Sequence, residues 1–251
     1  MTDDRRTIVK IVLFLTVVTI IGVGGNLWKS SLLVKTIDVV GVQNVPANQV
    51  IQLSGILVGL SMYDLNLTEI QRNVSSHYFV KRVLVERDLP GTVHLAVTER
   101  MPLAILSVDP MIYIDEEGVV LPPTNAKLVY DLPVISGVDK GEKLLPGERA
   151  AGADIDEAVR LLWTFRHGNR DMFHRISEVR LRNGGDIVLY SAEWGVPIVF
   201  GHGNIADKVA RLEAFWSDEV ALIGAQHLEY VDVRYEDQVI ARWKRSAGVS
   251  S

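Results

Sequence analysis

Six histidines are the side chains best suited to acid–base or metal chemistry in this chain, and their spacing supports neither role. None belongs to an H-E-x-x-H pair, and no two stand four residues apart, as two metal ligands on one helical face would. The absence of cysteine excludes disulfide scaffolds, zinc ribbons and thiol catalysis. Neither a G-x-S-x-G elbow nor a G-x-x-x-x-G-K-[ST] loop occurs. The histidines are His77, His94, His167, His174, His202 and His227.

One segment, 201–206, has the G-x-G-x-x-[GA] pattern of a dinucleotide-binding turn. It follows an expected strand and opens an expected helix, but only 45 residues remain after it, too few for a doubly wound sheet. Acidic pairs such as Asp115 with Glu116 lie in expected turns, where solvated carboxylates are common. We therefore expect no catalytic residue, metal or cofactor. The sequence does not exclude a pair of carboxylates that hydrolyses a glycosidic bond, but it points to no particular pair.

Composition narrows the class of protein further. A length of 251 residues suits one or two domains, and 48% hydrophobic with 23% charged residues is ordinary for a folded chain. The net charge of −5 lacks the basic excess that duplex nucleic acid requires of its ligands. We therefore expect no nucleic acid as a partner.

An apolar segment near the amino end predicts a single membrane span. Residues 11–28 carry no charge. A helix over residues 8–28 would be about 30 Å long, which is the thickness of a bilayer core. Arg5, Arg6 and Lys10 precede the uncharged stretch 11–28, so the positive-inside rule places residues 1–7 in the cytoplasm and the bulk of the chain outside. No small-x-small cleavage site follows, which favours an uncleaved anchor over a signal peptide.

The chain after the anchor divides into two blocks of an α+β fold. In residues 33–101 the pattern predicts a strand at 35–42, a helix after Pro46, a helix capped by Thr68, and a hairpin of strands 80–88 and 92–99. Residues 102–245 predict a mainly antiparallel β domain with packing helices, the first opened by a capping box of Asp154 and Glu157. The expected strands there are 104–108, 111–115, 119–121, 178–181, 187–190, 196–200, 228–235 and 238–243, with a second helix at 204–216 and a disordered tail at 246–251.

An ordered set of residues in both blocks resembles a known pattern. Its members are Val40 with Gly41, Gly59 with Leu60, Asp64, Phe79 with Val80, Val83, Arg87, Leu89 with Pro90, Thr92, 97–100, Pro102, Ala104, Ile114 with Asp115, Gly118, and 231–235 before a strand that reaches Trp243. The first block resembles a POTRA domain, and the whole chain resembles the bacterial FtsQ/DivIB cell-division family. The chain departs from that family where 77–79 lacks a proline–aromatic pair and where Asp237 and Gln238 stand in place of a turn glycine.

The resemblance implies a non-enzymatic scaffold of the divisome in the bacterial inner membrane at the septum. It implies binding of FtsB and FtsL, mainly through the last strand, and contacts of the POTRA domain with other division proteins. A terminal strand can present unpaired N–H and C=O groups to a partner strand, and large rigid side chains anchor interfaces. The partner-binding candidates are Arg234, Tyr235, Gln238, Val239, Ile240, Ala241 and Trp243.

Three other interpretations remain open at the level of sequence. Tyr235 and Trp243 could pack in the core of the β domain. The chain could be a POTRA-type chaperone or secretion component, although such proteins usually carry several POTRA units or a barrel. It could also be an anchored cell-wall enzyme, which predicts a deep pocket with convergent titratable groups.

Overall fold

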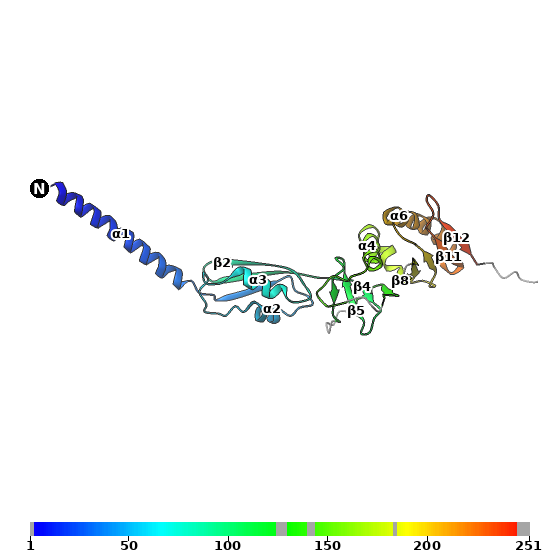
Figure 1. Cartoon of the computed structure of the whole chain (residues 1–251), viewed down its shortest axis with the longest axis horizontal. Helices are drawn as coiled ribbons and strands as arrows, with labels where there is room; N and C mark the ends of the chain where they lie inside the picture. The colour runs from blue at the N-terminus through cyan, green and yellow to red at the C-terminus, as the bar shows by residue number, and fades with distance from the viewer. Residues whose placement is uncertain (1–2, 124–129, 140–143, 183–184, 245–251) are drawn as a thin grey trace, which may run out of the picture. The chain divides into compact units, whose positions relative to one another are not determined.

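The computed structural model describes residues 3–123, 130–139, 144–182 and 185–244 (Figure 1). The chain divides into two compact units, Met1–Glu99 and Arg100–Ser251. The first unit opens with helix α1 (Asp3–Ser31), whose window Ile8–Gly25 is long and apolar enough to cross a membrane and is not buried in the protein. The expected tail 246–251 lies outside the described residues.

After α1 the first unit has the predicted order of one strand, two helices and two strands. These are β1 (Thr36–Val40), α2 (Ala47–Ser54), α3 (Leu67–Ser75), β2 (Val80–Asp88) and β3 (Thr92–Glu99). The sheet order is β1-β3-β2, with β1 parallel and β2 antiparallel to β3. The predicted cap of α3 is wrong, because Asn66, not Thr68, precedes the helix and accepts the N–H of Glu69.

Two residues of the family-like pattern hold the β1–α2 loop in place. The Glu99 carboxylate accepts the backbone N–H groups of Gln43, Asn44 and Val45 at 2.8–3.1 Å. Gly41 has φ +82°, and a Cβ there would lie 2.1 Å from the carbonyl oxygen of Val97. Only glycine fits this position, because any side chain would collide with the neighbouring strand.

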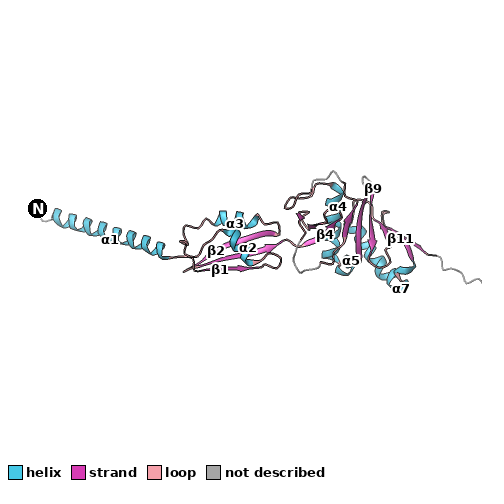
Figure 2. Cartoon of the chain, turned by 90° about the horizontal axis from the view of Figure 1, so that it is seen from below, coloured by secondary structure: helices cyan, strands magenta, loops and turns pink. Residues whose placement is uncertain are grey.

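The second unit is built on one mixed sheet of nine strands (Figure 2). The sheet order is β12-β11-β10-β9-β8-β7-β4-β5-β6, and five of its eight strand pairs are antiparallel. The strands are β4 (Pro102–Leu106), β5 (Ile112–Asp115), β6 (Val120–Leu121), β7 (Val134–Ser136), β8 (Ile176–Arg182), β9 (Gly185–Ser191), β10 (Pro197–Val199), β11 (Leu228–Asp232) and β12 (Ile240–Trp243).

Two longer helices supply much of the core of this unit. Helix α4 (Ala153–Gly168) buries Leu162 and Phe165, and α6 (Ile205–Phe215) buries Leu212. The shorter elements are α5 (Arg170–His174), the π-helical turn η1 (Trp216–Val220), α7 (Ala221–Ile223) and the 3₁₀ turn η2 (Ala225–His227). The fold is α+β, as predicted.

Three local predictions in this unit are wrong. Strand β7 lies in a segment for which no strand was predicted, between β4 and β8 and parallel to both. Helix α4 follows Gly152 and has no side-chain cap, so the capping box of Asp154 and Glu157 does not form. The final hairpin is also shorter than predicted: β11 ends at Asp232 and β12 begins at Ile240, so Gln238 and Val239 precede the strand.

Candidate functional site

Strand β12 lies at one edge of the nine-stranded sheet. It pairs antiparallel with β11, with Val231 opposite Ala241 and Asp232 opposite Ile240. The other side of β11 is occupied by β10. Among the described residues, β12 therefore has one neighbouring strand and one open side, as an edge strand does.

The open side of β12 presents the main-chain groups of alternate residues. The Lys244 N–H donates to the His227 carbonyl at 2.7 Å, so Lys244 points toward the β11 side. N–H and C=O groups of successive strand residues point to opposite sides, which turns Arg242 and Ile240 toward β11 as well. The N–H and C=O groups of Ala241 and Trp243 consequently point away from the sheet, where a partner strand would pair with them.

The side chains of the final strand divide between two faces. Val239, Ala241 and Trp243 pack against the core, and the Trp243 ring lies 6.3 Å from that of Phe215, centroid to centroid. Ile240 and Arg242 lie on the other, exposed face. Trp243 is thus half-buried, and a partner would meet its main chain together with the remaining exposed part of the ring.

The hairpin before β12 is held by a cation from helix α6. The Arg211 guanidinium donates to the main-chain carbonyls of Tyr235 and Gln238. Asp237 has φ +56°, so it takes the left-handed conformation that glycine adopts most easily and that Asp tolerates. Tyr235 is 46% exposed, which leaves its ring available to a partner.

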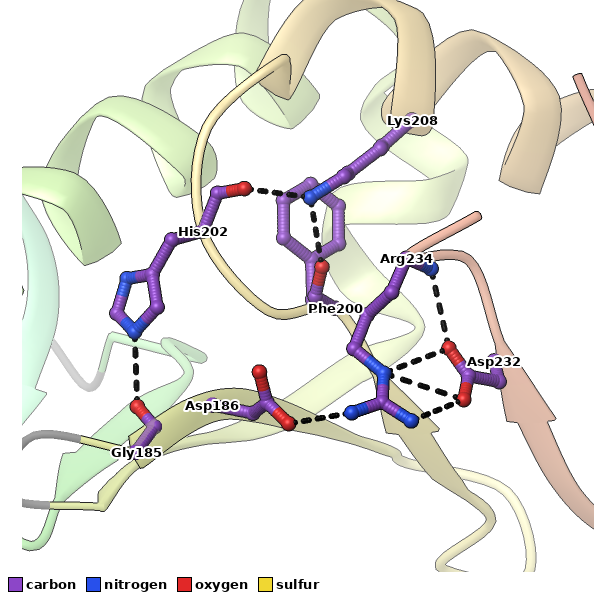
Figure 3. A network of polar contacts seen from close by, with 7 residues as sticks. All are labelled: Gly185, Asp186, Phe200, His202, Lys208, Asp232 and Arg234. Atoms are coloured by element: carbon purple, nitrogen blue, oxygen red, sulfur yellow. Dashed lines mark hydrogen bonds and ion pairs between the residues drawn. The ribbon is translucent and has the colours of Figure 1, made fainter. Parts of the chain in front are cut away.

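Arg234 has its charge balanced within the domain. Its guanidinium donates to both carboxylate oxygens of Asp232, at 2.7 Å and 3.0 Å, and to Asp186 at 2.7 Å (Figure 3). The hydrogen bond to Asp232 raises the pKa of Arg234. Burial would raise the pKa of Asp232, but the bonds from Arg234 lower it overall. Arg234 thus ties β11 to β9 behind the open edge, a structural role besides any contact with a partner.

The turn with the dinucleotide-like pattern binds a carboxylate of its own chain. Glu157 accepts the Gly203 N–H at 2.6 Å and His202 Nδ1 at 2.7 Å, while His202 Nε2 donates to the Gly185 carbonyl at 2.8 Å. The buried Lys208 ammonium donates to the main-chain carbonyls of Phe200 and His202 (Figure 3). The amide that a phosphate would use is therefore occupied by Glu157.

This arrangement shifts the pKa values of the groups in the turn. The hydrogen bond to Glu157 raises the pKa of His202, and both ring nitrogens face acceptors, which favours the imidazolium. Burial would raise the pKa of Glu157, but the bonds from Gly203 and His202 lower it. Burial lowers the pKa of Lys208. Among the described residues, no group of three or more His, Asp or Glu side chains could hold a metal ion.

The opposite edge of the same sheet is covered. The Val120 N–H in β6 donates to the Glu148 carbonyl at 2.9 Å, and the Val120 carbonyl accepts the Gly147 N–H at 2.8 Å. Val119 forms an isolated antiparallel bridge with Arg149. An irregular segment of the chain itself thus fills the position of a tenth strand at β6.

An apolar pair that sequence reasoning missed lies close to β12. Leu222 is 84% exposed in α7, and Ile223 beside it is also exposed. The Lys244 ammonium donates to the Gln226 carbonyl, so the end of β12 lies against the segment that follows this pair. The sequence does show two adjacent aliphatic residues just before Gly224. Nothing in the pattern of this short helix indicates that their side chains are exposed and not buried.

A helix able to span a membrane, a βααββ module and a β domain with an open edge define a POTRA-containing protein with one candidate span. Residues 32–100 match the model of the POTRA domain of FtsQ type, and residues 107–234 match that of the cell division protein FtsQ/DivIB C-terminal region. The chain belongs to the FtsQ/DivIB family of cell-division proteins, which are non-enzymatic scaffolds.

Three curated relatives, all cell division proteins FtsQ, are similar to this chain over most of its length. The cell division protein FtsQ of Syntrophotalea carbinolica is 30% identical over 83% of this chain and 73% of its own length. That of Rhodothermus marinus is 29% identical over 95% of this chain and 87% of its own length, and that of Geotalea daltonii is 28% identical over 82% and 74%. The C-terminal family match ends at Arg234, before β12.

Proposed function

We propose that this protein is an inner-membrane scaffold of the division septum that binds FtsB and FtsL by adding a partner strand to β12. Residues 1–7 lie in the cytoplasm in this proposal, α1 crosses the membrane, and the chain from residue 29 onward is extracytoplasmic. The POTRA unit, 33–101, contacts further division proteins, and the unit 102–245 carries the FtsB/FtsL interface. Nucleic acid and small molecules are not partners.

The observation that carries the proposal is the open side of β12. A strand with unpaired N–H and C=O groups binds an extended peptide through main-chain hydrogen bonds, while pockets and exposed side chains add specificity. Ala241 and Trp243 supply the outward main-chain groups, and the exposed side chains of Tyr235, Ile240 and Arg242 flank them. Gln238 and Val239 lie just before the strand and extend the same edge toward the turn.

Ala241→Pro tests this interface with little change to the fold. Proline removes the N–H that points toward the partner, whereas the N–H groups that pair with β11 belong to Ile240 and Arg242. We expect pull-down of the extracytoplasmic parts of FtsB and FtsL to weaken by about tenfold or more, since a lost hydrogen bond is joined by the clash of the ring.

The matched control is Ala241→Ser, which keeps the N–H and should bind as the wild type does. Circular dichroism and thermal melting establish that both variants are folded. Full binding by a folded Ala241→Pro protein would contradict strand addition at β12. In cells, depletion of the protein should give filaments without septa, whereas a secretion component would mislocalise envelope proteins and a wall enzyme would alter wall composition.

A further inference from the structure

Two uncharged loops of the POTRA unit expose aliphatic side chains at one end of its sheet. Residues 53–63 contain no charged residue, and within them Leu57 is 66% exposed and Val58 is 68% exposed. The β2–β3 turn 89–91 is also uncharged and exposes Leu89. Solvated aliphatic side chains gathered in this way mark a binding surface.

Main-chain hydrogen bonds tie both loops to the residues that directly follow α1. The Gly59 N–H donates to the Val34 carbonyl, the Val34 N–H donates to the Leu60 carbonyl, and the Met62 N–H donates to the Leu32 carbonyl, each at 2.8 Å. On the other side, the Lys35 N–H donates to the Gly91 carbonyl at 2.7 Å. The two loops therefore flank the segment 32–35 and cannot move away from it without unfolding.

Chain continuity sets how far these loops can lie from the membrane. Helix α1 continues to Ser31, and Leu32 stands four residues after Trp28, the aromatic residue expected at the interface. Four residues of helix rise about 6 Å, and the headgroup layer on each side of a bilayer core is about 5–8 Å thick. If α1 spans the bilayer, the hydrogen bonds to 32–35 keep both loops near the headgroup layer.

The sheet topology places the loops at the membrane-proximal end of the unit. Strands β1 and β3 are parallel, with Thr36 opposite Thr92 at one end and Val40 opposite Ala96 at the other. The chain enters this sheet at Thr36 beside the two loops and leaves it at Glu99, at the far end. The charged residues that border the apolar loops are few and of both signs: Lys35, Asp64 and Asp88.

We infer that the loops 55–63 and 89–91 insert their aliphatic side chains into the headgroup–acyl boundary of the bilayer that α1 crosses. The protein then has a second, interfacial contact with lipid, which holds the POTRA unit against the membrane. The inference rests on α1 as a span and is independent of the β12 interface.

The absence of cysteine makes the test direct. We would replace Val58 by cysteine, label it with an environment-sensitive fluorophore such as NBD, and reconstitute the full chain in vesicles containing headgroup-proximal quenchers. The matched control is Val40→Cys, which is also an exposed valine, 49% exposed, but lies at the other end of β1. Ile20→Cys in α1 reports whether the span itself is inserted.

The expected result is a blue-shifted emission and several-fold stronger quenching at position 58 than at position 40. Equal quenching at the two positions, or a water-exposed label at 58 while the label at 20 reports the acyl region, would overturn the inference. A signal at 58 that disappears when the protein is diluted in lipid would assign the surface to a second copy of the chain and would also overturn it. A label at 20 that reports water removes the premise that α1 spans the bilayer, and the inference is overturned with it.

Discussion

The two edge strands of the nine-stranded sheet differ in whether other parts of the chain cover them. At β6 the chain folds back on itself, and the main chain of Val120 bonds to Gly147 and Glu148. At β12 the outward main-chain groups of Ala241 and Trp243 have no strand beside them in the described part of the chain. Open edges promote unwanted pairing, so most folds cover or shorten them. A sheet that is covered at β6 and open at β12 fits the proposal that a partner strand binds at β12.

The open edge also carries features that limit indiscriminate pairing. Strand β12 has four residues, and its exposed face bears Arg242, which pairs with Glu229 at 3.1 Å. Short edge strands with cationic side chains disfavour edge-to-edge aggregation. Four tests probe the contrast between the two edges, and their expected effects decrease in turn.

A proline in the covered strand β6 should destabilise the domain much more than a proline in the open strand β12. Val120→Pro removes an N–H that donates to Glu148 and disturbs a fully buried side chain, so the free energy of unfolding should fall by more than about 3 kcal/mol. Ala241→Pro should lower it by less than about 1 kcal/mol, because its N–H points outward. Urea denaturation of both proteins measures this, and equal losses would mean that β12 is not an open edge.

The turn leading into the covered edge depends on a buried ion pair. Arg100 Nη1 lies 2.6 Å from Asp115, which is 1% exposed and accepts the N–H groups of Glu117 and Val119. Arg100→Met leaves that carboxylate without its cation and should cost about 3 kcal/mol of unfolding free energy. Arg149→Met, which breaks an exposed pair with Asp156, should cost less than about 1 kcal/mol. Similar losses in the two variants would exclude a special role for the buried pair.

Substitutions of Tyr235 and Trp243 should distinguish the contribution of each side chain to partner binding from its contribution to stability. Trp243→Ala removes the contact with Phe215, so about 2 kcal/mol of stability should be lost together with partner binding. Tyr235→Ala should weaken binding while stability stays within about 0.5 kcal/mol of the wild type, because the ring is exposed. Thermal melts with parallel pull-downs measure both, and full binding by Tyr235→Ala would remove that residue from the interface.

The smallest effect concerns pH and the turn behind the open edge. The raised pKa of His202 means that its pairing with Glu157 stabilises fully below about pH 6.5 and is lost as pH rises through the folded-state pKa. The lowered pKa of Glu157 adds stability above about pH 4.5 that is lost as pH falls. The exposed position of His202 limits the total to less than about 1 kcal/mol.

His202→Gln should therefore reduce the loss of stability between pH 6 and pH 8 relative to the wild type. Urea denaturation at the two pH values measures the difference, in which contributions from other histidines cancel. An unchanged pH dependence in the variant would show that the pair does not contribute.

Patterns that are local in sequence predicted most of the fold. Strands β2 and β3 were predicted at their observed bounds, because alternation on both sides of the turn 89–91 fixes a hairpin. Strand β7 could not be predicted, since its three residues, Val134–Ser136, are too few to show a period and lie between parallel partners far away in sequence. The role of Glu157 depends on residues 45 and 46 positions further on, which no capping pattern contains.

Four of the residues that carry the family resemblance hold local structure together. Gly41, Glu99, Arg100 and Asp115 fix loops and turns through close packing or multiple hydrogen bonds. The open edge has no comparable signature, because a strand that binds through its main chain accepts many side chains. The sequence could thus identify the scaffold and the terminal hairpin, while the covering of β6 and the half-burial of Trp243 required the structure.

A sheet closed at β6 and open at β12 can lengthen in one direction only. Among the described residues, β12 is the edge of this sheet that a further strand can reach, and identical copies of the domain have no second open edge through which to continue a fibre. Two copies that met at this edge would cap one another as a closed dimer and would leave no place for a third.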